Sequence, residues 1–193
     1  RLEQDQQRVV LKWNNEDWDL DLVTVGYFFT HSATGSGLGS GSGISVGMGT
    51  IEAVRVDYQT LTSGYGDVTI SLDIDNRDGS TPETMSWYGQ SSISEGISEV
   101  WVNKFAGSGA GDGSGFGSDL SQDISVDILC NGCSNHDDGL LEVVTPSACD
   151  LLQEVEWWLV GEFVISDGSI TWQTCTTQCY WSTWTSRFIV WAS

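Results

Sequence analysis

Residues 11–22 read LKWNNEDWDLDL, and this stretch sets the pattern that the rest of the chain repeats. Successive side chains of a β-strand point to opposite faces of the sheet, so residues two apart share a face. Leu20 and Leu22 therefore face inward together, while Asp19 and Asp21 project together. The stretch predicts a β-strand that carries two carboxylates at one edge of a candidate cation site.

A second acidic stretch, residues 72–83, reads LDIDNRDGSTPE and surrounds a glycine turn with carboxylates. Calcium takes about six to eight oxygen ligands. If the two stretches pair or face each other, their carboxylates repel unless a cation neutralises them. The sequence therefore predicts a calcium site with the candidate ligands Asp19, Asp21, Asp75, Asp78 and Glu83. The alternative is that Asn76 and Asp78 are ordinary turn formers and that Asp19 and Asp21 are solvated.

Apolar and polar residues alternate most regularly over residues 67–75. This alternation predicts an inward row made of Val68, Ile70, Leu72 and Ile74. Asp73 and Asp75 then lie side by side on the outer surface. Further strands are predicted at residues 9–13, 20–29, 52–58, 83–88, 97–105, 120–129, 140–144, 155–165, 169–173 and 187–192. Residues 155–165 are apolar enough for a central strand pair, and residues 147–156 are the one short helix candidate.

About ten short strands with glycine-rich connections predict an all-β fold, an antiparallel β-sandwich. At 193 residues the chain fits a single domain, 1–193. Within this domain, residues 1–8 are expected to form a polar N-terminal arm, and residues 130–193 a closing segment rich in cysteine and tryptophan. Two long Gly/Ser-rich loops, residues 31–49 and 106–118, interrupt the strands. Loops of such length are commonly functional.

The composition disfavours some partners and favours a secreted, β-rich protein. The chain has 27 acidic and 7 basic residues, a net charge of -20, which disfavours nucleic acid and anionic membranes as partners. Its 23 glycines and 10 tryptophans are typical of a secreted, β-rich protein. No apolar run approaches the roughly 20 residues that a membrane-spanning helix needs. The chain begins at Arg1 without a signal peptide, as a processed or excised chain would.

The cysteines also favour an oxidising, extracellular compartment. All five lie in the last third of the chain, where they predict local disulfides among Cys130, Cys133, Cys149, Cys175 and Cys179. Because five is odd, one thiol is either free or bonded to another chain. The CNGC stretch at residues 130–133 suits a zinc half-site, a redox pair or a tight disulfide. A disulfide is favoured because no second CxxC follows.

Several short motifs resemble a known family. Leu11 and Trp13 form an L-x-W motif, residues 19–22 read DLDL, and an acidic glycine turn at residues 75–79 leads to Pro82 and Glu83. Together with a strand at 99–105, these motifs resemble a family of secreted and periplasmic β-sandwich domains of unknown function. They are more distantly similar to tellurium-resistance stress domains, whose DLD strand and acidic loop bind calcium. The resemblance covers about residues 9–129 and implies a β-sandwich. The chain departs from the family pattern in three ways. Val23 stands where the family often has histidine, residues 80–83 read STPE where the family has GxGPE, and the chain has two Gly/Ser insertions.

The C-terminal stretch CTTQCYWSTWTSR contains Trp181, Trp184 and Arg187 and resembles a fragment of a thrombospondin repeat. This resemblance implies tryptophans that stack with arginine and carry C-linked mannose. In a strand, however, Trp181 and Trp184 fall on opposite faces, so one core and one surface tryptophan is an equal interpretation. A third interpretation is that exposed tryptophans stack on sugars or become buried in a subunit interface. The chain lacks an N-glycosylation sequon, so glycans are expected on Ser or Thr of the two long loops.

The sequence offers little support for catalysis. It contains no phosphate-binding loop, and neither His31 nor His136 has a histidine partner at zinc-ligand spacing. We therefore expect a non-catalytic extracellular protein, a structural or adhesive subunit of a cell-surface filament, appendage or matrix that forms homo-oligomers or polymers. The alternative is a calcium-dependent carbohydrate-binding module that binds glycans.

Overall fold

The computed structural model describes residues 6–14, 18–30, 50–76, 80–89, 93, 95–105, 124–134, 139–146 and 157–175. Several predicted segments lie outside these residues, among them both Gly/Ser loops, the helix candidate at 147–156, the late strand at 187–192, and residues 1–5 of the arm.

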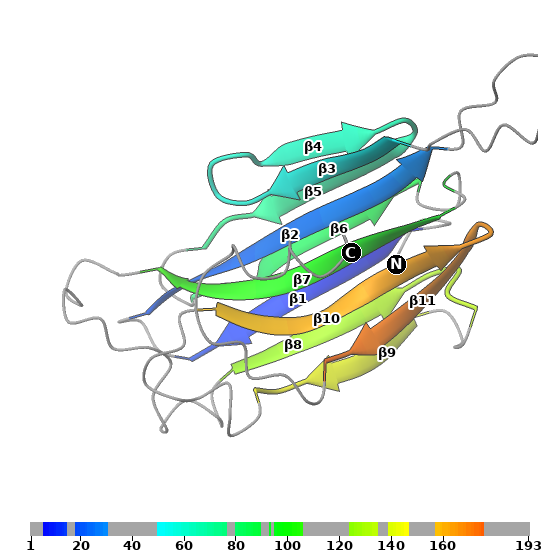
Figure 1. The fold of residues 1–193 in the computed structure, drawn as a ribbon. Helices are drawn as coiled ribbons and strands as arrows, with labels where there is room; N and C mark the ends of the chain where they lie inside the picture. Colours follow the sequence, from blue (N-terminus) through cyan, green and yellow to red (C-terminus); the bar gives the residue numbers. More distant parts are fainter. Residues whose placement is uncertain are drawn as a thin grey trace, which may run out of the picture.

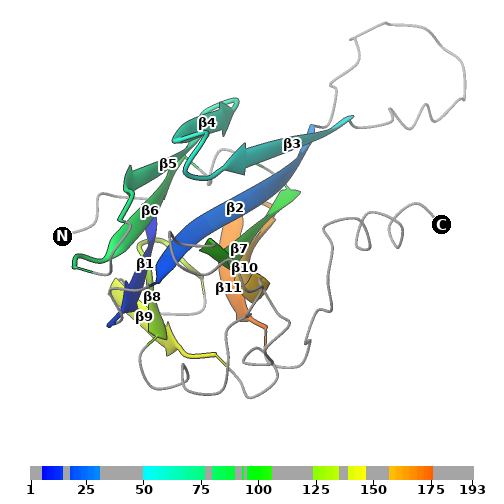
Figure 2. The ribbon, with the colours of Figure 1, turned by 90° about the vertical axis from the view of Figure 1, so that its left-hand side faces the viewer.

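The described residues form two antiparallel sheets that pack face to face, which confirms the predicted all-β sandwich (Figures 1 and 2). The six-stranded sheet has the order β4 (Thr62–Tyr65), β5 (Val68–Ile74), β6 (Glu83–Tyr88), β1 (Gln7–Trp13), β8 (Ile124–Cys130) and β9 (Gly139–Val144). The five-stranded sheet has the order β11 (Ser169–Thr174), β10 (Trp157–Ser166), β7 (Glu95–Phe105), β2 (Asp19–Thr30) and β3 (Thr50–Val56).

The N-terminal strand β1 lies in the middle of its sheet, between β6 and β8. Gln7 and Arg8, which were assigned to the polar arm, already belong to this strand, and the side chain of Gln6 before it is buried. Backbone pairing from two neighbours thus outweighs the polar composition of these residues. The strand places Gln7 opposite Cys130 and Leu11 opposite Glu83, so Cys130 and Glu83 lie at opposite ends of β1.

The core lies between the sheets and follows the alternation read from the sequence. Val9, Leu11 and Trp13 of β1 are buried on the inner face. Aromatic rings join the layers: Trp87 of β6 meets Phe163 of β10 edge to face, with ring centroids 5.3 Å apart. Burying a side chain of this size stabilises the fold by roughly 1.5–3 kcal/mol.

The alternation fails at the end of β5. The register shifts between Leu72 and Ile74, because Leu72 pairs with Met85 and Ile74 pairs with Thr84. A β-bulge of this kind inserts one extra residue and reverses the faces of the residues after it. Ile74, predicted to face inward, is therefore 46% exposed, and that prediction was wrong.

Two further elements differ from expectation. The short strand β4 was not predicted, because its sequence, TSGY, lacks an apolar alternation. Residues 155–165 were expected to form a pair of strands, but β10 is a single strand that pairs with both β7 and β11.

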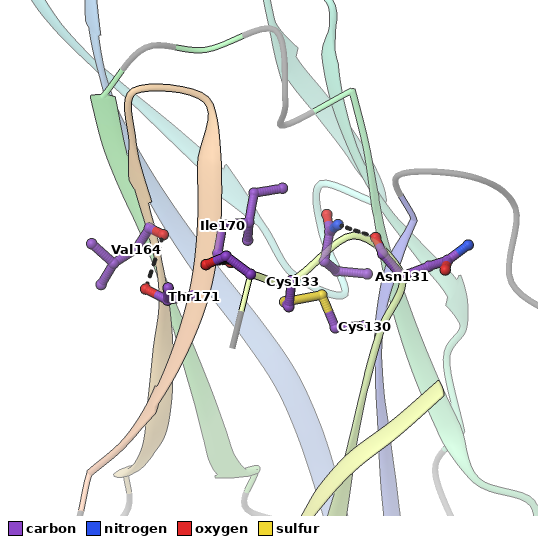
Figure 3. Close-up of a disulfide and its surroundings, with 8 residues drawn as sticks. Cys130, Asn131, Cys133, Val164, Ile170 and Thr171 are labelled. Carbon is purple, nitrogen blue, oxygen red and sulfur yellow. Dashed lines mark hydrogen bonds between the residues drawn. A yellow bond between two sulfur atoms is a disulfide. The ribbon is translucent and has the colours of Figure 1, made fainter. Parts of the chain in front are cut away.

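A disulfide joins Cys130 and Cys133 at the end of β8 (Figure 3). The turn that it closes brings Cys133 beside Ile170 of β11, in the other sheet, where Ser134 N–H donates a 2.9 Å hydrogen bond to the Ile170 carbonyl. On its other side, Asn131 N–H donates to the carbonyl of Gln6. The turn therefore connects the two layers at one end of the sandwich.

Candidate functional site

Glu83 connects the two sheets at the end opposite to the disulfide. It is the first residue of β6 and is fully buried. Its Oε1 accepts a 2.6 Å hydrogen bond from the backbone N–H of Leu22 in β2. Strand β3 pairs with β2 only from Thr24 onward, so the edge of β2 at Leu22 is open to a side chain from the other sheet.

Two more carboxylates lie beside Glu83. Asp21 comes from β2 and Asp75 follows β5, and one carboxylate oxygen from each of the three residues lies within 4.8 Å of the others. Asp75 reaches this group because of the bulge in β5. Ile74 pairs with Thr84 on the outer face, so the next residue, Asp75, lies on the side of the strand where Glu83 is, and it remains exposed to solvent there. The two acidic stretches singled out in the sequence thus meet, and we call Asp21, Asp75 and Glu83 the acidic cluster.

The cluster is electrostatically costly without a cation. The pKa of Glu83 is raised from its ordinary value of 4.5 to about 9, and burial is the largest cause. The hydrogen bond from Leu22 lowers the pKa, the charges of Asp21 and Asp75 raise it, and a backbone hydrogen bond from Asn76 lowers it. A group that is fully buried beside two acids keeps its proton near neutral pH, unless a positive charge enters.

The residues of the cluster fit a hard divalent cation. Glu83 Oε2 is buried and accepts no hydrogen bond from the described residues. A buried polar oxygen usually has a partner, so this atom is a candidate metal ligand. All three side chains offer carboxylate oxygens, which suit calcium or magnesium rather than the softer metals.

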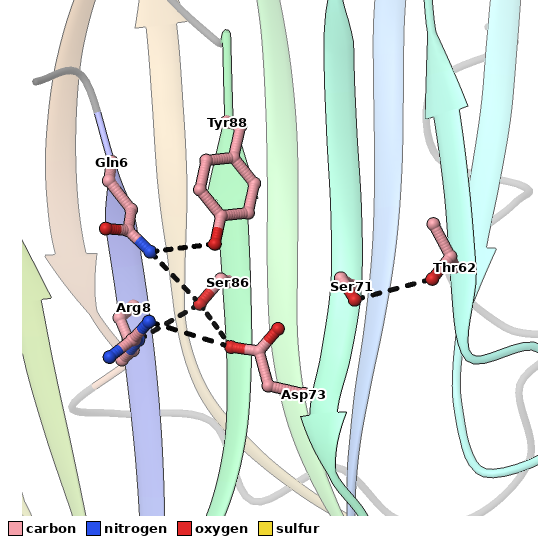
Figure 4. Close-up of polar contacts among 7 residues, drawn as sticks. All are labelled: Gln6, Arg8, Thr62, Ser71, Asp73, Ser86 and Tyr88. Atoms are coloured by element: carbon pink, nitrogen blue, oxygen red, sulfur yellow. Dashed lines mark hydrogen bonds and ion pairs between the residues drawn. The ribbon is translucent and has the colours of Figure 1, made fainter. Parts of the chain in front are cut away.

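The other predicted ligands behave differently. Asp19 belongs to β2 and is not one of the three residues of the cluster, although its Oδ1 is buried. Asp78 lies outside the described residues. Asp73 and Asp75 are both exposed, as predicted. Asp73 accepts a 2.5 Å hydrogen bond from Ser86 Oγ and lies 3.9 Å from Arg8 Nη2 (Figure 4). The bulge separates it from Asp75.

Asn76 was treated as a turn former, but the structure gives it a further role. Its side chain is 7% exposed, and its Nδ2 donates to the carbonyl of Thr81. This bond holds together the two ends of the acidic turn from which Asp75 and Glu83 emerge. An asparagine directly after the acidic strand is the only sequence signal for this contact.

The cysteine and tryptophan predictions are partly resolved. Cys130 and Cys133 form the predicted disulfide, whereas Cys175 carries a free thiol. Cys149, Cys179, Trp181 and Trp184 lie outside the described residues. In the described part of the chain, no helix is long and apolar enough to cross a membrane.

Comparisons with known proteins bear on the fold alone. No protein-family model matches the sequence. No curated protein sequence matches it either. Among solved structures, the chain is similar to the unknown function protein SAV2460, with a TM-score of 0.54 and 18% sequence identity over 89% of this chain and 88% of that one. The similarity supports the β-sandwich architecture.

Proposed function

We propose that the chain is a non-catalytic extracellular domain that binds calcium at Asp21, Asp75 and Glu83 and uses the ion to hold its two sheets together. One observation carries the proposal: Glu83 is fully buried beside two carboxylates, and its Oε2 lacks a hydrogen-bond donor among the described residues. A cation would supply the missing partner and would offset the negative charges of the three groups once Glu83 has released its proton.

The placement of the ligands favours a structural role for the ion. Asp21 belongs to the five-stranded sheet and Glu83 to the six-stranded sheet, and Asp75 directly follows β5 of the six-stranded sheet. An ion bound by all three would bridge the two sheets next to the part of β2, before Thr24, that does not pair with β3. Calcium is preferred to magnesium because its coordination shell is larger and tolerates irregular geometry. Backbone carbonyls and water would complete the shell.

We further propose that the domain serves as a structural or adhesive subunit of a cell-surface filament, appendage or matrix and forms homo-oligomers or polymers. The net charge of -20 and the disulfide support an extracellular setting. Calcium-dependent stability would suit a protein that must hold its shape outside the cell. Negative-stain electron microscopy of the native material distinguishes a polymer from a monomer, and the second result would count against the subunit role.

Thermal unfolding with and without calcium tests the ion. A ligand at about 100 times its Kd adds about 2.7 kcal/mol, which raises Tm by roughly 5–10 °C for a chain of this size. Asp21→Asn and Asp75→Asn should each abolish most of this shift. Asp73→Asn is the matched control, because Asp73 lies two residues from Asp75 but faces outward. If calcium leaves Tm unchanged in the native chain, the proposed ion is wrong.

A calcium-dependent carbohydrate-binding module is the second candidate. The outer face of the six-stranded sheet favours it, because the partly exposed side chains of Arg8 and Tyr88 offer hydrogen-bonding groups there, next to the buried Ser86 and Gln6 to which they bond (Figure 4). Sugars are bound by polar side chains of this kind next to aromatic rings. A glycan array with and without chelator separates the candidates, since a purely structural subunit should select no glycan.

A further inference from the structure

The outer faces of the two sheets differ in polarity. On the six-stranded sheet, neighbouring strands place Thr62, Ser71, Ser86 and Arg8 in one row across β4, β5, β6 and β1 (Figure 4). Polar residues are expected on a face that meets water. This row is polar, although Ser86 within it is covered by its neighbours. The exposed apolar residues of the same sheet, Ile74, Leu140 and Val143, lie outside the row.

The five-stranded sheet carries an apolar row in the middle of its outer face. Val23 of β2, Trp101 of β7 and Leu159 of β10 lie opposite one another in register and therefore form one row. Ile97 and Val164 are paired in the same way further along β7 and β10. We call these residues, with Val25, the outer strip: Val23, Val25, Ile97, Trp101, Leu159 and Val164.

The centre of the outer strip is already shielded from water. Val23, Val25 and Leu159 are only 2%, 5% and 4% exposed, yet none of them belongs to the core cluster between the sheets. The described strands make two layers, and none of these strands lies over the outer face of the five-stranded sheet (Figure 2). This combination indicates that a third layer covers the strip.

We propose that the covering layer is the C-terminal segment of this same chain, residues 176–193. Its sequence supplies the apolar surface that the strip requires, with Trp181, Trp184, Phe188, Ile189, Val190 and Trp191. Two other long segments outside the described residues, 31–49 and 106–123, are dominated by glycine and serine and bury little apolar area. A third, residues 147–156, has three acidic residues, which Glu99 and Glu162 on this face would repel. This inference does not depend on the cation site.

The starting point and the length of the segment suit this placement. Cys175 N–H donates a 3.1 Å hydrogen bond to the carbonyl of Val160, so the segment begins next to Leu159 in β10. Eighteen residues, 176–193, reach about 60 Å when extended. The strip spans β10, β7 and β2, about 10 Å in all at the usual strand spacing.

Charge supports the same placement. Arg187 is the only charged residue of the segment, in a chain whose net charge is -20. Glu99 of β7 and Glu162 of β10 lie directly opposite each other on the outer face, next to the apolar row. Like charges at opposite positions repel, so this pair attracts a cationic group.

Disulfide trapping tests the proposal in the full chain, because Cys179 lies within the segment. In a background with Cys149→Ser and Cys175→Ser, Val23→Cys is compared with Val143→Cys. Val143 is 52% exposed on the outer face of β9, the strand whose Glu142 accepts a hydrogen bond from Thr174 at the end of β11. Both introduced thiols therefore lie within reach of the segment, on different faces. Mild oxidation and peptide mapping should show an intramolecular bond from Cys179 to position 23 and little to position 143.

Two outcomes would overturn the proposal. A bond between Cys179 and position 23 of a different molecule would assign the strip to a second copy, and equal bonding at positions 23 and 143 would show no docking. A measurement without introduced cysteines guards against misfolding: trypsin should cleave the native chain after Arg187 roughly tenfold more slowly than it cleaves the Val25→Asp variant. Equal cleavage rates, with Val25→Asp still folded by circular dichroism, would also reject the covering layer.

Discussion

The backbone N–H of Leu22 in one sheet donates a 2.6 Å hydrogen bond to Oε1 of Glu83 in the other. Position 83 thus has two separate tasks: to accept this hydrogen bond and, in the proposed function, to bind a cation. Substitutions at Glu83 separate the two tasks, because an amide keeps an acceptor oxygen but loses the charge.

Glu83→Gln should keep the fold and lose the response to calcium. Its amide oxygen still accepts from Leu22 N–H, so Tm in chelator should remain close to that of the native chain. Glu83→Leu leaves that buried N–H unpaired, at a cost of about 1–3 kcal/mol, and should lower Tm in chelator by roughly 2–10 °C. Calorimetry of the three proteins in chelator measures the difference. Equal melting of the Gln and Leu variants would show that the hydrogen bond contributes nothing.

The calcium-free protein should become less stable as the pH rises from about 4.5 to about 9. The pKa of Glu83 is raised from 4.5 to about 9 in the folded chain, chiefly by burial. Over that interval the folded state retains a proton that the unfolded state has released, so the stability from this group is complete below pH 4.5 and lost as pH rises through 9. Urea unfolding in chelator across this range measures the slope. Glu83→Gln should remove this part of the pH dependence, and an unchanged slope would contradict the assignment to Glu83.

Calcium binding near pH 7 should release about one proton per ion. Glu83 is protonated there in the calcium-free chain because its pKa is about 9, whereas a metal ligand must be ionised. Titration calorimetry in two buffers with different ionisation enthalpies counts the protons. Binding without proton release would mean that Glu83 does not coordinate the ion.

Gly89→Ala should destabilise the fold more than Gly66→Ala. Both glycines have positive φ, 74° and 59°, where a side chain costs roughly 1 kcal/mol. A Cβ at Gly89 would also lie 2.2 Å from the Asp67 carbonyl oxygen, whereas a Cβ at Gly66 would meet nothing within 4 Å. Chemical denaturation of the two variants therefore separates backbone strain from the steric clash. If both lose the same stability, the backbone at Gly89 has moved to make room.

The sequence predicted the sandwich because the alternation of apolar residues survives in most strands. Val9, Leu11 and Trp13, for example, face the core as the pattern requires. It failed where the period of two is interrupted: the bulge after Leu72 exposes Ile74 and could not be read from a regular pattern. β4 was missed because a four-residue edge strand needs no apolar face.

The acidic cluster was predicted in part. Both acidic stretches were identified, and Asp21, Asp75 and Glu83 do meet. Asp73 and Asp75 are both exposed, as the alternation predicts, but the bulge puts Asp75 and not Asp73 beside Glu83. The contact of Glu83 with Leu22 depends on where β3 stops pairing with β2, which no local pattern encodes.

Loss of the Cys130–Cys133 disulfide should loosen one end of the sandwich without affecting calcium. The disulfide closes a four-residue turn, and chain-entropy estimates for so short a loop give about 2 kcal/mol, or roughly 4–8 °C in Tm. Hydrogen exchange at Ser134 N–H should accelerate, because its bond to the Ile170 carbonyl depends on the turn.

A double variant, Cys130→Ala with Cys133→Ala, tests this expectation. Its calcium response should equal that of the native chain, because Cys130 and Glu83 lie at opposite ends of β1. Cys175→Ser is the control: its thiol is free, so neither Tm nor exchange at Ser134 should change. A loss of the calcium response in the double variant would show that the two ends of the sandwich are coupled, since the disulfide turn contributes no ligand to the acidic cluster.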